Sequence, residues 1–362
     1  MSLFMKAALD LARSRQGYCF PNPSVGAVVV QNGMIVGEGC HWNCGEAHAE
    51  VVAIQDAAAA AHGADLFVTL VPCHHQGQTP PCTDAIIQGG IARVFYGYED
   101  PGDQVDTLHS LQLLHDAGVY CERLISSDID MFYQAYRHWC TRKQPRITLK
   151  LALSKDGKTA HGDGSPANIT GPALQTFTHE QRLRHDGLLT TSKTIVADNP
   201  RFNVRLENDT ISKPLFVLDS TLETPLDAHI WHTAASVTFF YDPLVASAAR
   251  LAAFQTRQGT CVPMPVNNDN HLDWSAIMTY TGALGLHSIW IESGGTLASA
   301  LLCRHAVHDL WLYWGQCVLG SEAKEGLQPS AFAVLQEAES QWQTIGGERV
   351  CQMTWGEPCL QD

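Results

Sequence analysis

Two segments contain the candidate metal ligands around which we expect the first part of the chain to fold. They are residues 45–50 (Gly-Glu-Ala-His-Ala-Glu) and residues 72–82 (Pro-Cys-His-His-Gln-Gly-Gln-Thr-Pro-Pro-Cys). They contain one imidazole, His48, and two thiols, Cys73 and Cys82. A catalytic zinc ion takes three protein ligands of these types and leaves its fourth tetrahedral position open to water. The two segments therefore predict a zinc site.

Glu50 follows His48 by two residues and adds a carboxylate that need not bind the metal. Two thiolates cancel the charge of zinc, and the neutral centre still lowers the pKa of its water. A carboxylate beside that water can take its proton and pass it to a departing amine, as in nucleobase deaminases. We expect Glu50 to be this proton carrier. The alternatives are a closed structural zinc site with a fourth protein ligand, or buried thiols without metal.

Three further residues are candidates for the pocket around the zinc. Asn22 stands between Pro21 and Pro23, so its amide is held on a rigid loop and offers both a donor and an acceptor to a ring edge. A simple turn is the alternative for this loop. His74 and His75 follow Cys73, and we expect them to line the pocket or to support the ligands rather than to bind zinc.

The sequence around these motifs alternates helical and strand patterns, which predicts an α/β layered domain. The pair Asn32-Gly33 between two apolar runs predicts a hairpin. The Ala-rich run Ala57–Ala61 is expected to continue a helix. The expected elements are a helix over Leu3–Arg15, strands over Val25–Val30 and Met34–Glu38, a helix over His48–His62, a strand over Leu66–Val71, a helix after Pro81 and a strand over Arg93–Tyr98.

A second domain is expected to begin near residue 145. The basic segment Arg137–Arg146 contains Pro145 and is interpreted as a linker, which divides the chain into residues 1–144 and residues 145–362. The second part also mixes the two patterns. The expected elements there are strands over Ile147–Leu153, Gly187–Leu189, Leu215–Asp219, Val237–Tyr241, Ser288–Glu292 and Leu310–Trp314, with helices over Pro172–Arg184 and Thr296–Arg304.

Composition limits the partners that this chain can have. Its 362 residues with 45% hydrophobic content suffice for two cores, and its net charge of −14 disfavours nucleic acid and anionic lipid. The short Arg137–Arg146 segment is the one basic cluster of the sequence, which argues against an RNA-editing deaminase. No apolar run reaches the ~18 residues of a membrane span. Twelve scattered cysteines indicate a reducing compartment, so we expect a cytoplasmic protein that binds neither membrane nor nucleic acid.

Six segments of the chain form a recognisable set: PNPSVG at 21–26, GEAHAE at 45–50, PCHHQGQTPPC at 72–82, KLALSKDGKTA at 150–160, TIVADNP at 194–200 and IWIESGGTLASALL at 289–302. Together they resemble the bifunctional riboflavin-biosynthesis deaminase/reductase family, in the right order and over nearly the whole chain. The resemblance implies a cytidine-deaminase-like three-layer α/β/α domain with zinc on His48, Cys73 and Cys82. It also implies a dihydrofolate-reductase-like α/β domain that uses NADPH, and a homo-oligomer, dimer or higher. The substrate implied is 2,5-diamino-6-ribosylamino-4(3H)-pyrimidinone 5′-phosphate, which is deaminated before its ribosyl chain is reduced to ribityl.

The resemblance also carries over residues for the reductase half. The glycines before Thr296 follow a strand and precede a helix, where free N–H groups can hold a phosphate, although a structural turn is the alternative. Arginine suits a phosphate because its planar fork donates two hydrogen bonds. The positions implied for substrate are Ser165, Arg184, Phe202, Arg205 and Glu292, and those implied for NADPH are Leu153, Asn168, Thr194, Asp198, Ser220, Gly294, Gly295 and Thr296.

Four positions depart from the family pattern. Val71, His74 and Gln78 replace the glutamate, serine and arginine usual around the first cysteine, and Asn168 stands where a tryptophan is expected near the cofactor. These changes leave the zinc ligands intact but alter groups that recognise substrate. Two alternatives therefore remain: a paralogous deaminase/reductase for a related aminopyrimidine, and a non-catalytic, zinc-stabilised nucleotide-binding protein.

Overall fold

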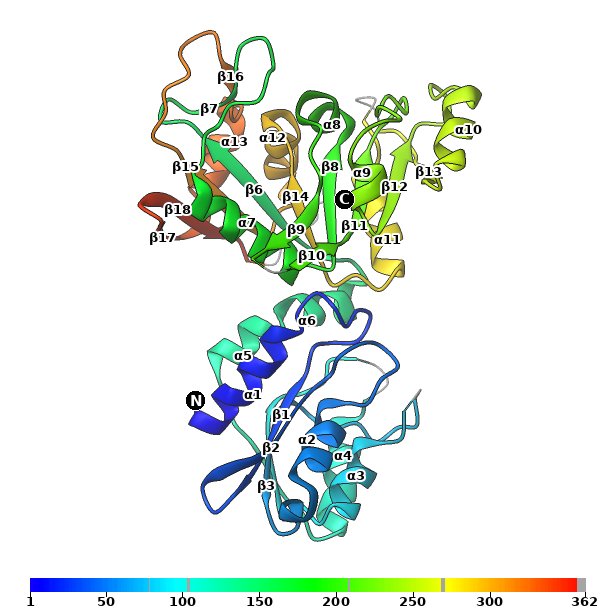
Figure 1. The fold of residues 1–362 in the computed structure, drawn as a ribbon, viewed down its shortest axis with the longest axis vertical. Helices are drawn as coiled ribbons and strands as arrows, with labels where there is room; N and C mark the ends of the chain where they lie inside the picture. Colours follow the sequence, from blue (N-terminus) through cyan, green and yellow to red (C-terminus); the bar gives the residue numbers. More distant parts are fainter. Residues whose placement is uncertain (78, 103–104, 208, 268–270, 357–362) are drawn as a thin grey trace. The chain divides into compact units, whose positions relative to one another are not determined.

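The computed structural model describes residues 1–77, 79–102, 105–207, 209–267 and 271–356. The chain forms two compact units (Figure 1). The first comprises Met1–Gln144 together with Gly282–His287, and the second comprises Pro145–Thr281 and Ser288–Asp362. A short segment from late in the sequence thus belongs to the first unit, which the sequence pattern gave no reason to expect.

The first unit is a five-stranded sheet with helices on both faces. Its strand order is β2-β1-β3-β4-β5, with β2 and β3 antiparallel to β1 and with β3, β4 and β5 parallel. The elements are α1 (Leu3–Ser14), β1 (Gly26–Gln31), β2 (Met34–Cys40), α2 (Ala49–Ala57), the 3₁₀ helix η1 (Ala58–Ala61), β3 (Asp65–Leu70), α3 (Cys82–Gln88), β4 (Arg93–Tyr98), α4 (Thr107–Asp116), β5 (Tyr120–Arg123), α5 (Ser127–Phe132) and α6 (Gln134–Arg142).

Alternate residues of β1 reach two separate cores. Val28 packs with Leu9 of α1 in one cluster, whereas Val29 packs with Ala53 of α2 in the other. Successive side chains of a strand point to opposite faces of the sheet, so β1 contributes apolar side chains to both faces. Both faces are therefore covered by helices. The expected three-layer α/β/α arrangement of this unit is therefore confirmed.

A hairpin turn and two glycines of β2 set the position of α2. Asn32 and Gly33 have φ values of 53° and 77°, so the expected hairpin turn joins β1 and β2. A Cβ atom on Gly37 or Gly39 of β2 would lie 2.3 Å or 2.2 Å from a backbone oxygen of α2. The two glycines thus let α2 (Ala49–Ala57), whose N-cap is His48, pack directly on the strand.

Two expectations for the first unit were wrong. The α-helix ends at Ala57, because Ala58 has a φ of 50° and Ala58–Ala61 forms a 3₁₀ turn. The basic segment Arg137–Arg146 is not an open linker, since its first six residues lie in α6, where His138 and Cys140 are buried. In α6, the burial of His138 and Cys140 accounts for a packed helix in spite of the basic composition of the segment.

The second unit has a nine-stranded sheet in the order β13-β12-β11-β8-β14-β6-β15-β18-β17, parallel from β13 to β15 and antiparallel from β15 to β17. Its elements are β6 (Arg146–Leu153), β7 (Lys158–Ala160), α7 (Pro172–Arg184), β8 (Gly187–Thr191), α8 (Ser192–Asp198), β9 (Asn203–Leu206), β10 (Asp209–Ser212), β11 (Pro214–Leu218), α9 (Ile230–Thr233), β12 (Ser236–Tyr241), α10 (Ala248–Thr256), β13 (Thr260–Pro263), α11 (Trp274–Ala283), β14 (Ser288–Glu292), α12 (Gly295–Cys303), β15 (Asp309–Trp314), β16 (Lys324–Glu325), α13 (Pro329–Leu335), β17 (Glu339–Ile345) and β18 (Glu348–Thr354).

Strands β8, β14 and β6 are neighbours at the centre of the sheet of the second unit. Leu188, Trp290 and Leu149, one from each, are fully buried. In an open parallel sheet, ligands bind beyond the carboxyl ends of such strands. That edge is therefore where a site is expected in this unit.

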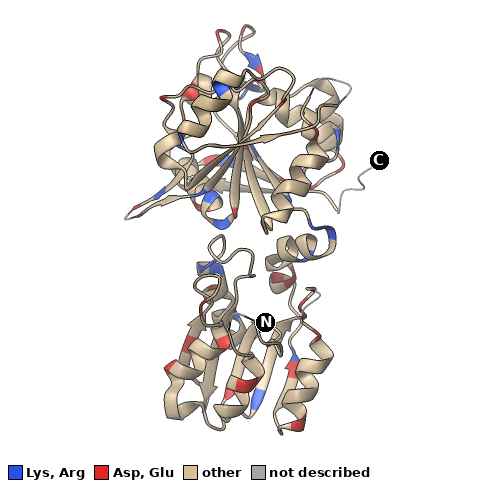
Figure 2. Cartoon of the chain, turned by 90° about the vertical axis from the view of Figure 1, so that its right-hand side faces the viewer, with Lys and Arg blue, Asp and Glu red and all other residues tan. Residues whose placement is uncertain are grey.

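The placement of charged residues along the chain and the character of the helices bear on both units. Figure 2 shows Lys and Arg interspersed with Asp and Glu along the elements of both units. Among the residues that the structure describes, no helix combines the length and the apolarity needed to cross a bilayer.

Candidate active sites

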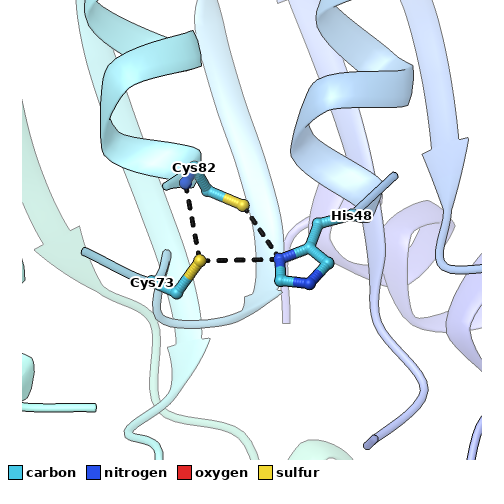
Figure 3. A group of neighbouring side chains, drawn as sticks. All are labelled: His48, Cys73 and Cys82. Carbon is cyan, nitrogen blue, oxygen red and sulfur yellow. Dashed lines mark hydrogen bonds between the residues drawn. The ribbon is translucent and has the colours of Figure 1, made fainter. Parts of the chain in front are cut away.

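In the first unit the three predicted zinc ligands come together (Figure 3). The ligand atoms of His48, Cys73 and Cys82 all lie within 4.8 Å of one another. The two sulfurs face the same ring nitrogen, since His48 Nδ1 lies 3.2 Å from Cys82 Sγ and 3.5 Å from Cys73 Sγ. No fourth His, Cys, Asp or Glu of the described residues joins the group. This arrangement fits an open, three-ligand zinc site better than a closed structural one.

Helix starts hold two of the three ligands. His48 is the N-cap of α2, and Cys82 is the first residue of α3. The Cys82 N–H points to Cys73 Sγ at 3.4 Å, so the start of α3 donates to the other sulfur. Thr79 Oγ1 lies 3.4 Å from His48 Nε2, the ring nitrogen away from the sulfurs. A partner on that nitrogen fixes the orientation of the imidazole, and sequence reasoning missed it.

The pKa values of the two thiols differ, so that one of them is a thiolate and can attract a cation. The hydrogen bond from Cys82 lowers the pKa of Cys73 to about 4. The same contact and burial raise the pKa of Cys82, so without metal the pair shares one proton. A bound zinc ion deprotonates coordinating thiols outright. The donor set and its charge therefore fit zinc.

Glu50 lies buried in the first turn of α2, with 3% of its surface exposed. Burial raises its pKa to about 7, and the charge of His48 opposes that shift only in part. The carboxyl is not one of the metal-ligand group. A group with such a pKa can both accept and release a proton at neutral pH.

Asn22 is held by His41, a residue that sequence reasoning missed. His41 Nδ1 lies 3.2 Å from the carbonyl oxygen of Ala47, which only accepts, so this nitrogen carries the proton. His41 Nε2 is then an acceptor, and Asn22 Nδ2 donates to it at 3.2 Å. Burial lowers the pKa of His41, which keeps the ring neutral. The amide nitrogen of Asn22 is thereby committed, and its oxygen stays available as an acceptor.

His74 and His75 lie beside the zinc group without joining it. His74 Nδ1 is 3.0 Å from Oγ of the buried Ser110, and its ring meets that of His109 edge-on at 4.7 Å. His75 Nδ1 is buried and has no hydrogen-bond partner among the described residues. Two departures noted in the sequence differ in outcome: Val71 is buried in the core, and Gln78 lies outside the described residues.

In the second unit, a buried ion pair marks the carboxyl edge of the sheet. Glu292 ends β14 and binds Arg182 of α7 through two contacts, Nε–Oε1 at 2.6 Å and Nη2–Oε2 at 3.0 Å. Trp290 Nε1 donates to Glu292 Oε1 at 2.8 Å. Lys150 of β6 is the register partner of Glu292 in the sheet. Of these neighbours, neither Arg182 nor Lys150 was singled out from the sequence.

The positive charges around Glu292 lower its pKa by more than burial raises it. Burial alone would raise its pKa, but Arg182 and, less strongly, Lys150 bring it to about 2. Lys150 is itself shifted, since burial lowers its pKa and the charge of Glu292 opposes that shift. Glu292 is thus a permanent carboxylate at neutral pH.

The residues expected to bind the reductase substrate do not all meet. Phe202 is buried beneath the Arg182 guanidinium, at 5.4 Å from ring centroid to Cζ. Burial and the nearby charge of Arg182 lower the pKa of Arg205. Arg184 is instead exposed at the end of α7. Ser165 is also exposed, and its N–H and hydroxyl both donate to Asp163 Oδ1.

The residues expected to bind the cofactor lie mostly just after strands of the parallel sheet. Gly294 is the N-cap of α12, and a Cβ atom on Gly295 would lie 2.2 Å from the carbonyl oxygen of Gly326. Such a close approach needs glycine, so the loop is structurally required as well as suited to a phosphate. Of the other positions, Leu153 ends β6, Thr194 and Asp198 belong to α8 after β8, Ser220 follows β11, Thr296 lies in α12 and Asn168 is exposed in the loop before α7.

Two family models match the chain, one to each part. The model described as "Cytidine and deoxycytidylate deaminase zinc-binding region" covers residues 1–98. The model described as "RibD C-terminal domain" covers residues 145–350. The expected order of a deaminase domain before a reductase domain is therefore confirmed.

Curated relatives and solved structures match over nearly the full length. The riboflavin biosynthesis protein RibD of Haemophilus influenzae is 34% identical over 336 residues, covering 89% of this chain and 87% of the relative. RibD of Escherichia coli is 34% identical over 333 residues, covering 89% of each. A structure of Acinetobacter baumannii RibD superposes with a TM-score of 0.83 at 26% identity and covers 97% of both chains. A Thermotoga maritima deaminase/reductase structure gives a TM-score of 0.81 at the same identity and coverage.

Proposed function

This chain belongs to the RibD family of bifunctional riboflavin-biosynthesis deaminase/reductases, and from that premise we propose which of its residues carry out each reaction. The observation that carries the proposal is the three-ligand group of the first unit with the buried carboxyl of Glu50 beside it. We assign deamination to residues 1–144 and reduction to residues 145–362.

The deaminase substrate that we propose is 2,5-diamino-6-ribosylamino-4(3H)-pyrimidinone 5′-phosphate. His48, Cys73 and Cys82 would hold the zinc ion, which when bound acidifies water and polarises the reacting centre. Glu50 takes a proton at its carboxylate and returns it to the departing ammonia, a role that its pKa of about 7 supports.

Asn22 recognises the ring edge in this proposal. Its free amide oxygen is a hydrogen-bond acceptor, and an exocyclic amine of a pyrimidine is a matching donor. His74 and His75 line the same pocket, where the partnerless Nδ1 of His75 supports a role in binding substrate. These contacts orient the amine-bearing carbon toward Glu50.

The reductase uses NADPH, which supplies the hydride when bound. Glu292, Phe202 and Arg205 contact the substrate in our proposal, and Arg182 joins them because it pairs with Glu292. Ser165 and Arg184 remain predicted substrate contacts, although their exposure gives them less support. The cofactor contacts that we propose are Leu153, Asn168, Thr194, Asp198, Ser220, Gly294, Gly295 and Thr296.

Location and assembly are also part of the proposal. We propose a cytoplasmic homo-oligomer, dimer or higher, that binds a phosphorylated pyrimidine and neither nucleic acid nor membrane. The cysteines of the described residues are all free, which supports a reducing compartment. Sedimentation of the purified protein would give its oligomeric state.

The test supplies the diamino pyrimidinone phosphate and NADPH to zinc-loaded protein. We expect ammonia release together with loss of the nicotinamide absorbance, both dependent on protein concentration. If neither signal changes, the assignment fails. Ammonia from another aminopyrimidine, with none from this one, would show that the departures at Val71, His74 and Gln78 have changed the substrate.

A further inference from the structure

The segment Gly282–His287 is part of the first unit although it lies far along the sequence. Trp139 Nε1 of α6 donates to the carbonyl oxygen of Gly282 at 2.9 Å. A Cβ atom on Gly285, whose φ is +82°, would lie 2.5 Å from Cβ of Pro21. The segment therefore packs closely against the loop that carries Asn22.

His287 makes a directed contact with that loop. The ring is buried, with 7% of the residue exposed, and its Nε2 lies 2.9 Å from the carbonyl oxygen of Pro21. A carbonyl only accepts, so Nε2 donates. This oxygen belongs to the peptide group that joins Pro21 to Asn22. His287 thus fixes the peptide plane immediately before the predicted pocket residue.

The side-chain amide and the backbone amide of Asn22 are both held by hydrogen bonds. Its side-chain nitrogen donates to His41 at 3.2 Å, and its backbone nitrogen donates to the Cys19 carbonyl oxygen at 2.9 Å. Rotation of the Pro21–Asn22 peptide would disturb both contacts and move the free amide oxygen. A hydrogen bond to the carbonyl of that peptide opposes such rotation.

The imidazole of His287 is itself kept in place by α6. Its centroid lies 5.1 Å from that of Tyr136 and 5.0 Å from that of Trp139. Tyr136 in turn donates to Asp100 Oδ1 at 2.9 Å. Two aromatic neighbours and one directed hydrogen bond leave the ring little freedom, so it is a rigid support for the loop.

We propose that His287, contributed by the C-terminal half of the sequence, is a positioning residue for the deaminase, because its hydrogen bond to Pro21 sets the orientation of Asn22 toward the substrate. This inference rests on the proposed role of the first unit as the deaminase. It makes the deaminase dependent on residues beyond 144, which neither the zinc motif nor the family model of residues 1–98 includes.

The test compares two full-length variants with the unaltered protein. His287→Phe keeps an aromatic ring for Tyr136 and Trp139 but removes the donor, and His287→Gln restores an N–H donor of similar reach. Five quantities are measured for each: kcat and KM for ammonia release, KM of the reductase for the deaminated intermediate, zinc content, and the hydrogen–deuterium exchange rate of the Asn22 backbone amide.

For His287→Phe we expect the deaminase KM to rise roughly ten-fold with a smaller change in kcat, since small misplacements of a substrate-positioning group are costly. The reductase KM and the zinc content should not change, and the Asn22 amide should exchange faster. His287→Gln should bring the KM and the exchange rate back to within about three-fold of the unaltered protein.

The proposal is overturned if His287→Phe leaves the deaminase KM unchanged, or if both variants are impaired equally. It is also overturned if zinc content or the reductase falls together with the deaminase, since that pattern indicates a general loss of structure. If the unaltered protein releases no ammonia, the proposed deaminase function fails. The exchange rates still decide the positioning role in that case: faster exchange in His287→Phe alone supports it, and equal rates refute it.

Discussion

Glu50 in the first unit is a buried carboxyl and Glu292 in the second is a largely buried one, with 14% of its side chain exposed, yet their pKa values shift in opposite directions. Burial raises the pKa of Glu50 to about 7, against only partial opposition from His48. Burial also acts on Glu292, but the charge of Arg182 outweighs it and brings the pKa to about 2. The nearest cation therefore decides whether a buried carboxyl carries protons or remains charged. The first unit has a carboxyl that can exchange a proton near neutral pH, and the second has a fixed anion.

The two sites also differ in how their parts are brought together. His48 and Cys82 are separated by 34 residues, and each stands at the start of its own helix. Arg182 of α7 and Glu292 at the end of β14 are separated by 110 residues, and only the fold brings their side chains together. The first arrangement follows from a local motif, and the second follows from the packing of distant elements.

The largest effect is expected from Glu50→Gln, which removes the proton carrier without changing the size of the side chain. Loss of a general acid–base group lowers the rate by roughly 10²–10⁴-fold, so ammonia release should fall by about that factor. Zinc content and NADPH oxidation with the deaminated intermediate should stay as in the unaltered protein. Steady-state assays of both activities on one preparation would measure this.

Cys82→Ser is the matched control for Glu50→Gln. It removes a metal ligand, so it should lower both zinc content and ammonia release, again without loss of the reductase. If Glu50→Gln also released zinc, Glu50 would be a ligand rather than a proton carrier.

Arg182→Met should have the next largest effect, because it leaves the carboxylate of Glu292 buried without its partner. Breaking a buried ion pair on one side costs roughly 3–5 kcal/mol, so the free energy of unfolding of the second unit should fall by about that amount and the reductase should weaken. Arg184→Met, at the exposed end of the same helix, should leave the free energy of unfolding nearly unchanged. Urea unfolding followed by tryptophan fluorescence would compare them. Equal effects of the two changes would contradict the importance of the ion pair.

The smallest effect expected is a pH dependence of stability due to Glu292. Its pKa is about 2 in the folded protein and 4.5 without the fold, so the folded state binds fewer protons between these values. The stabilisation is present above about pH 4.5 and disappears as the pH falls toward 2, and its size is about 3 kcal/mol. Glu292→Gln cannot titrate, so the difference in unfolding free energy between it and the unaltered protein should shrink by that amount from pH 6 to pH 2. A difference that stays constant would refute the low pKa.

Local sequence predicted much of the first unit correctly. The Asn32-Gly33 turn appears as expected, because both residues adopt positive φ at low cost there. His48 and Cys82 stand at helix starts, as Pro81 and the helical pattern after His48 predicted. By contrast, the helix expected through His62 ends at Ala57, because Ala58 adopts a positive φ of 50° and the chain continues as a 3₁₀ turn.

The sequence by itself predicted the zinc-ligand group and the α/β class, because these depend on residue types at short spacing and on hydrophobic period. The order of the two domains came from the resemblance of six sequence segments to the family. Only the tertiary structure decided that Arg182 rather than Arg184 faces Glu292, and that His41 and His287 hold the loop of Asn22. These contacts join residues across strands and between elements far apart in the chain. Their partners are chosen by packing and strand register, which no local pattern encodes.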